Sequence, residues 1–230
     1  RHTRYISVTG VQPCALPIST EAARTLADAG AKLTQADPDG VTALHIAILN
    51  SHFDTAALLV EKGADINQAD STGMAALYAA IDMNTLGEIF GRPGRASTGK
   101  LSALDLAKIL LDKGANPNAG LRTSTLQCAH TPGEPTLGEG ATPIARAART
   151  GDTVAIELLL KYGADVNQPL KNGTTPLMFA TGLGRGVSAF QKDTGTEAEL
   201  LAAAKLLLDH GADINAISAA GQDRKSTRLN

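Results

Sequence analysis

Four short apolar runs recur along the chain, and a glycine follows each run at the same distance. The runs are Leu58–Val60, Ile109–Leu111, Leu158–Leu160 and Leu206–Leu208. The glycines, three residues after each run, are Gly63, Gly114, Gly163 and Gly211. Glycine readily takes the left-handed conformation that ends a helix. The pattern therefore predicts four helices that bury these runs and end at these glycines.

Threonine–proline pairs mark where other helices begin. Thr142-Pro143 and Thr175-Pro176 place a hydroxyl at the N-cap and a proline at the first helical position. Proline lacks an N–H there, where no intrahelical acceptor exists anyway. At Ala75-Ala76 both features are absent, so we expect the weakest helix start at that point, by about 1 kcal/mol.

The two kinds of helix belong to one repeating unit. Asp37–Gly40 and Asp70–Gly73 lie 33 residues apart, as do Gly140 and Gly173. The closing phrase Gly63–Asn67 recurs three more times, ending at Asn118, Asn167 and Asn215. Periods of this length are typical of repeat architectures, in which each unit buries its apolar face only against its neighbours.

This unit resembles the ankyrin repeat, which reads D-x-x-G-x-T-P-L-H-x-A-A, a leucine-rich run, and G-A-D-x-N. The resemblance covers nearly all of residues 20–222, and the style of the insertions is similar to that of bacterial ankyrin repeat proteins. It implies an all-α solenoid of stacked antiparallel helix pairs with hairpin connections. It also implies protein recognition without catalysis, with His45 bonding backbone between repeats.

The repeat register divides residues 19–222 into units of unequal length. We expect a half repeat (19–36), four repeats (37–69, 70–120, 137–169 and 170–217), a finger insertion (121–136) and the start of another repeat (218–222). Repeats two and four carry 18 and 15 additional residues between their helices, and the finger insertion adds 16. Because neither end carries a polar capping repeat, we expect partly exposed ends.

The two ends of the chain differ in character from the repeats. Val8–Ile18 and Asp223–Asn230 resemble translations of the two strands of one sequencing adapter. We interpret residues 1–18 and 223–230 as non-native, so that the sequence would be a fragment; the alternative is a native arm and a basic tail. With these segments left out, Cys128 is the one remaining cysteine and no intrachain disulfide is expected.

Composition narrows the class of protein. Hydrophobic residues make up 43% and charged residues 19%, which argues against wholesale disorder, and no apolar stretch is long enough to span a membrane. The net charge is −2; without the five basic residues and one acid of the two end segments it becomes −6. Nucleic-acid or anionic-membrane binding needs a positive field, so neither is expected. The compartment, cytoplasmic or periplasmic, is not readable, and we expect a monomer.

Two surfaces are candidates for partner contact. The resemblance places one on the hairpin tips and inner helices. Its candidate residues are Pro38, Asp39, Val41, Leu49, Asn50, Ser71, Thr72, Met74, Gly138, Glu139, Arg149, Thr150, Lys171, Asn172 and Thr174. The second is a basic edge with aromatic residues, formed by the two inter-helix insertions. These insertions should lie about 20 Å apart, at ~10 Å per helix layer. The alternative is that both insertions are simply solvated loops. The residues of this edge are Phe90, Arg92, Arg95, Lys100, Arg185, Phe190 and Lys192.

Motifs that suggest chemistry fall short of it. Gly94–Lys100 is a near match to a phosphate-binding loop, but Leu101 stands where the magnesium-binding Ser or Thr belongs. Cys128 and His130 supply too few ligands for a metal site. We therefore expect no cofactor, no metal and no catalytic residue. Two alternatives to a recognition module stay open: the targeting arm of a larger enzyme, and a structural spacer.

Overall fold

The protein, described here from a computed structural model, is a stack of short helices. The structure describes residues 19–85, 99–123, 137–183 and 195–219, and these contain nine helices and no strand. The helices are α1 (Thr20–Asp28), α2 (Ala43–Leu49), α3 (Phe53–Glu61), α4 (Ala76–Thr85), α5 (Ala103–Asp112), α6 (Pro143–Thr150), α7 (Thr153–Lys161), α8 (Pro176–Ala180) and α9 (Glu197–Asp209). The all-α class predicted from the repeat is thus confirmed.

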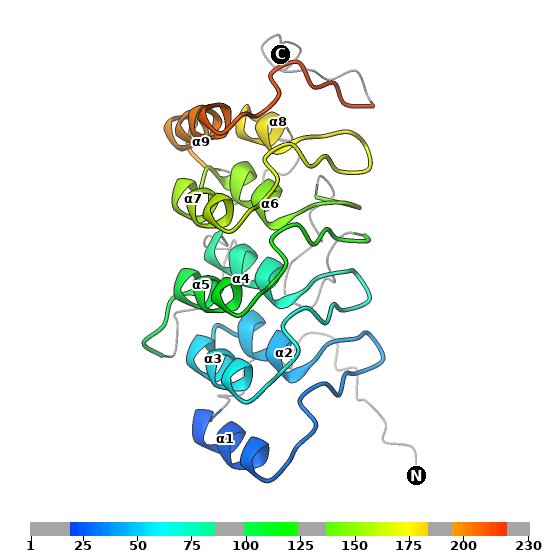
Figure 1. Cartoon of the computed structure of the whole chain (residues 1–230), viewed down its shortest axis with the longest axis vertical. Helices are drawn as coiled ribbons and strands as arrows, with labels where there is room; N and C mark the ends of the chain where they lie inside the picture. The colour runs from blue at the N-terminus through cyan, green and yellow to red at the C-terminus, as the bar shows by residue number, and fades with distance from the viewer. Residues whose placement is uncertain (1–18, 86–98, 124–136, 184–194, 220–230) are drawn as a thin grey trace, which may run out of the picture.

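The helices form two rows that run the length of the molecule (Figure 1). The inner row holds α2, α4, α6 and α8, and the outer row holds α1, α3, α5, α7 and α9. Each inner helix packs against the outer helix that follows it, α2 on α3, α4 on α5, α6 on α7 and α8 on α9. Successive inner helices also pack on one another, so each unit lies between two neighbours. This is the solenoid expected from the repeat.

The predicted N-cap residues and terminal glycines lie at the ends of the observed helices. The hydroxyls of Thr142 and Thr175 accept hydrogen bonds from backbone N–H groups in the first turns of α6 and α8, and proline follows each of them. Gly63 and Gly114, just beyond α3 and α5, both have a φ of +91°. Only glycine adopts this left-handed conformation without strain. The predicted helix ends are therefore confirmed.

The outer helices that follow the two inter-helix insertions have start signals of their own. Ser102 and Asp105 form a capping box at α5, and Thr196 and Glu199 form one at α9. In each, the hydroxyl accepts the third N–H of the helix while the carboxylate accepts the N–H of the cap residue. The cap hydroxyl also donates to the same carboxylate. For Asp105 the bond from the Ser102 hydroxyl, together with the Ser102 N–H, lowers the pKa below its ordinary value. For Glu199 the bond from the Thr196 N–H, together with the Thr196 hydroxyl, lowers the pKa in the same way. Each helix thus begins at a defined residue after an insertion of variable length.

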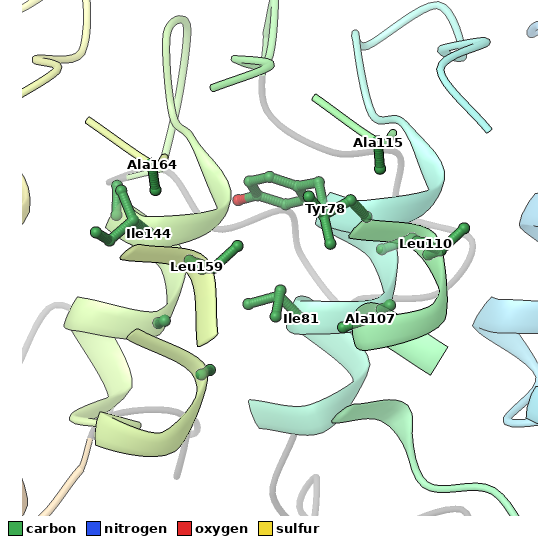
Figure 2. Packing of buried hydrophobic residues seen from close by; sticks show 14 of the residues in the cluster. Tyr78, Ile81, Ala107, Leu110, Ala115, Ile144, Leu159 and Ala164 are labelled. Carbon is green, nitrogen blue, oxygen red and sulfur yellow. The ribbon is translucent and has the colours of Figure 1, made fainter. Parts of the chain in front are cut away.

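The core is one continuous apolar seam between the rows and between successive units. Figure 2 shows the side chains of Tyr78 and Ile81 on α4 pointing toward the next helix pair, which carries Ile144 and Leu159. Full burial of a leucine or isoleucine contributes about 1.5–3 kcal/mol. Because these side chains join different units, the same burial that stabilises each helix also fixes the spacing of the stack.

Candidate functional site

Hairpin-like connections project from one side of the stack, between each outer helix and the next inner helix (Figure 1). We call these connections fingers: residues 36–42, 69–75, 119–123 with 137–142, and 170–175. Backbone hydrogen bonds join the tips of successive fingers. Ser71 N–H donates to the Asp39 carbonyl at 2.7 Å, and Lys171 N–H donates to the Glu139 carbonyl at 2.9 Å. The backbone of each finger is thus held by its neighbour.

The ladder of tips continues across the unit that carries the finger insertion and on toward the C-terminal end. Arg122 N–H donates to the Thr72 carbonyl at 2.7 Å. Ala219 N–H donates to the Asn172 carbonyl at 2.7 Å, after the last complete finger. These bonds span four successive unit boundaries in the described part of the chain. The tips therefore form a row in which backbone hydrogen bonds hold each tip to the next.

Close packing of the fingers leaves no room for side chains at certain positions. Gly73 has a φ of +86°, and a Cβ atom built on it would lie 2.6 Å from the backbone N of Arg122. Asp70 shapes the same finger from inside, because its Oδ1 accepts hydrogen bonds from the N–H groups of Thr72 and Met74. Both features set the path of the backbone at the tip.

The candidate contact residues on the fingers and inner helices divide by exposure. Exposed residues are Pro38, Asp39, Ser71, Glu139, Lys171 and Asn172; half-buried ones are Val41, Leu49, Gly138 and Thr150; buried ones are Asn50, Thr72, Met74, Arg149 and Thr174. A buried side chain cannot touch a partner without rearrangement. Thr72, for example, donates its hydroxyl to Asp70 at 2.6 Å. The accessible part of the candidate surface is consequently the row of finger tips.

Charged residues of both signs lie on this row. Glu139 and Lys171, on neighbouring tips, form an exposed ion pair of 2.6 Å in addition to their backbone hydrogen bond. Asp39 lies exposed on the first tip, where its own N–H donates to the carboxylate of Asp37. Exposed ion pairs contribute little stability. The pair therefore adds little to the stability of the fold.

A buried ion pair joins two inner helices. Arg146 of α6 donates through Nε to Oδ1 of Asp82 in α4, at 2.5 Å, and both side chains are almost fully buried. Two residues after Asp82, Asn84 donates to Oδ2 of Asp152, the N-cap residue of α7, at 2.6 Å. Sequence reasoning did not find this cluster, because Asp82 and Arg146 occupy different register positions that hold other residues elsewhere. The pair shows that the position four residues after the N-cap faces the preceding inner helix.

His45 links the first finger region to the second, as the resemblance implies. Its Nε2 lies 2.9 Å from the Met74 carbonyl, and its Nδ1 lies 2.9 Å from the Thr42 hydroxyl. A carbonyl can only accept, so Nε2 carries the proton and Nδ1 accepts from Thr42. Burial lowers the pKa of His45, against the opposing effect of the Met74 carbonyl and nearby carboxylates. The ring is thus a neutral structural bridge.

A second bridge between repeats was missed by the sequence analysis. We call it the asparagine clamp. The amide of Asn118 donates to the Gly163 carbonyl at 3.0 Å and accepts from Asp165 N–H at 2.7 Å. Asn67 and Asn167 make the same pair of bonds one unit before and one unit after. The sequence does contain a sign of the clamp, because asparagine recurs at one register position. The backbone groups to which each asparagine bonds lie in the next repeat, so the sequence alone does not reveal the contact.

Of the proposed basic edge, only Lys100 falls within the described residues, where it is exposed. Its backbone N–H donates to Oδ2 of Asp54 at the start of α3, at 2.7 Å. A Cβ atom on Gly99 would lie 1.3 Å from that same oxygen, so a side chain at position 99 would displace this contact. The remaining edge residues, Phe90, Arg92, Arg95, Arg185, Phe190 and Lys192, lie outside the described residues, as does most of the near-match phosphate loop.

The described residues offer neither a metal-binding cluster nor a membrane-spanning helix. Residues 19–85, 99–123, 137–183 and 195–219 contain no cluster of three or more His, Cys, Asp or Glu side chains arranged to hold a metal ion. Among the helices in these ranges, none combines the length and apolar character of a membrane span.

Comparison with known proteins identifies the repeat. A family model described as ankyrin repeats (3 copies) matches residues 15–120 and 100–218 of the chain. No curated protein matches the chain significantly. The two matched ranges together include all nine helices of the described structure.

Proposed function

Because the chain belongs to the ankyrin repeat family, we propose that it is a non-catalytic recognition module that binds another protein through its finger tips. Ankyrin repeats indicate a protein–protein interaction module. The single observation that supports the finer proposal is the ladder of backbone hydrogen bonds from Asp39–Ser71 to Asn172–Ala219.

The ladder matters because association has an entropic cost. Ordering a loop at an interface costs free energy that is subtracted from the affinity. The finger backbones are already ordered by one another, so a partner that contacts several tips orders mainly side chains. A rigid frame that carries exposed polar groups is how many binding surfaces are built.

The chemistry of the tips favours a polar, mixed-charge partner surface. Asp39 and Glu139 offer carboxylates, Lys171 offers an ammonium group, and Ser71 and Asn172 offer short hydrogen-bonding side chains. Opposite charges in fixed order select a partner by complementarity and exclude those with like charges in register. Specificity would then come from the order of charges along the stack.

The test compares two variants that change the net charge equally. The finger variant carries Asp39→Lys, Glu139→Lys and Lys171→Glu, all at exposed tip positions. The control carries Glu61→Lys, Glu157→Lys and Lys113→Glu, which are exposed on or beside the outer helices and change the net charge equally. Both variants and the parent are immobilised, and proteins captured from cell extract are quantified by mass spectrometry.

We expect at least one protein that the parent and the control capture equally and that the finger variant captures at least tenfold less. Equal loss in both variants would place the contact elsewhere or make it non-specific charge binding, against the proposal. If the parent captures nothing above an unrelated solenoid, the chain acts as a spacer and the proposal is wrong.

A further inference from the structure

The charged side chains on the finger tips differ in whether they already have a partner. Glu139 and Lys171, on the last two fingers, pair with each other at 2.6 Å. Asp39 is exposed on the first finger, and Arg122 is exposed on the first arm of the third. Within the ranges that the structure describes, neither of these two makes an ion pair or hydrogen bond through its charged group. Sequence reasoning did not select Arg122, because it lies in the finger insertion, where no repeat register applies.

The backbone fixes Arg122 against the second finger. Its N–H donates to the Thr72 carbonyl at 2.7 Å. Its Cγ atom lies 3.0 Å from the point that a Cβ on Gly73 would occupy, so the stem of the arginine packs on the bare backbone of that glycine. The guanidinium group therefore extends from a fixed point beside the second finger.

Asp39 is fixed from the other side of the same finger. Its carbonyl accepts the Ser71 N–H at 2.7 Å, and its own N–H donates to the carboxylate of Asp37 at 3.0 Å. Asp37 is also exposed, so the first finger carries two carboxylates. Because successive helix layers are about 10 Å apart, the carboxylate of Asp39 and the guanidinium of Arg122 are held about 10–20 Å apart. Ions screen most of the attraction at that distance, so both charges are open to a partner.

On the basis of the proposed finger-tip function, we infer that the N-terminal half of the finger row binds an extended segment of another protein. The segment places a basic side chain on Asp39 and an acidic side chain on Arg122. An arginine binds a carboxylate through two parallel hydrogen bonds, so Arg122 determines the specificity for the acidic residue.

The spacing of the two charges follows from the row of tips. An extended chain advances about 3.3 Å per residue, so the basic and acidic residues stand about three to six positions apart. A helix advances about 1.5 Å per residue and would need about seven to thirteen positions for the same distance. Ser71, exposed on the finger between them, offers its hydroxyl to the connecting residues.

A random peptide library tests this inference. Twelve-residue peptides displayed on phage are selected on the immobilised full chain and on two variants, Arg122→Glu and Asp39→Lys. The matched controls are Lys113→Glu and Glu157→Lys, which are exposed on or beside the outer helices and change the net charge by the same amounts. Circular dichroism checks that every variant is folded, and sequencing gives the charges of the enriched peptides and their spacing.

We expect the parent and both controls to enrich, at least fivefold, peptides with a basic and an acidic residue about three to six positions apart. Arg122→Glu should change the enriched pair to two basic residues, and Asp39→Lys should change it to two acidic residues. Enriched peptides that lack the pair, that carry it only at helical spacing, or that stay the same in both variants would overturn the inference.

The same peptides separate this inference from the proposed function. If peptides without the charge pair lose binding to the finger variant, the finger tips still bind protein and the inference alone fails. If they bind the finger variant and the parent equally, both fail. A parent that enriches no peptide also overturns the inference, whereas the proposed function is judged separately by the capture of proteins from extract.

Discussion

Replacing Asn118 with alanine removes both side-chain bonds of one asparagine clamp without touching the helices. The lost bonds are Asn118 Nδ2 to the Gly163 carbonyl, 3.0 Å, and Asp165 N–H to Asn118 Oδ1, 2.7 Å. A typical hydrogen bond contributes about 0.5–1.5 kcal/mol net. Since Asn118 is half-buried and water can replace part of each bond, the lower half of that range applies, about 1–2 kcal/mol in all.

Urea denaturation followed by circular dichroism measures this loss. With an m value of about 2 kcal/mol per molar urea, the midpoint should fall by about 0.5–1 M. The matched control is Asn215→Ala. Asn215 occupies the same register position at the last unit, but in the described part of the chain its side chain makes no equivalent bonds. We expect the control to shift the midpoint by less than 0.2 M. Equal shifts in the two variants would refute the view that the clamp stabilises the boundary between repeats.

Four further outcomes are expected. Because burial lowers the pKa of His45 below its ordinary 6.5, the unfolded chain takes up a proton more readily than the folded one. The free energy of unfolding should therefore fall as pH drops below about 6.5, and His45→Phe should flatten this slope in urea titrations from pH 7.5 to 5.5. Gly63→Ala should cost about 1 kcal/mol from the left-handed backbone alone, because its Cβ would meet nothing within 4 Å. Gly73→Ala should cost about 2–4 kcal/mol in the same assay, because its Cβ would also press on the Arg122 backbone. Leu159→Ala should lower the free energy of unfolding by about 2–5 kcal/mol, since Leu159 is fully buried and its removal leaves a cavity that the surroundings fill only in part; a cost below 1 kcal/mol would mean that the seam is loosely packed.

Features that recur in every repeat were predictable from the sequence, because each recurrence is independent evidence for the same local conformation. Glycine at one register position marked the helix ends, and Thr-Pro at another marked the helix starts. Local conformation decides both, so no knowledge of distant contacts was needed. The resemblance to ankyrin repeats then supplied the stacking.

Features that occur once were not predictable. The Asp82–Arg146 pair uses register positions that hold Leu49 and Ala79 in the corresponding places of neighbouring units, so no periodic signal marks it. The repeat register also could not predict which candidate contact residues are buried. The family pattern includes the aspartate at position 70 but leaves position 72 open, and the threonine of this chain lies buried there because its hydroxyl donates to Asp70.

The third finger is pinned on both sides of residues 124–136. Arg122 bonds to Thr72 on the preceding finger, and Leu121 exchanges backbone hydrogen bonds with Gly140 and Ala141 on the other arm. The two anchor points are therefore fixed by the frame itself, whatever length of chain connects them. This makes the span between Thr123 and Leu137 a natural place to graft a foreign peptide. An epitope or sensor sequence inserted there would be displayed from a finger whose backbone hydrogen bonds do not depend on the inserted residues.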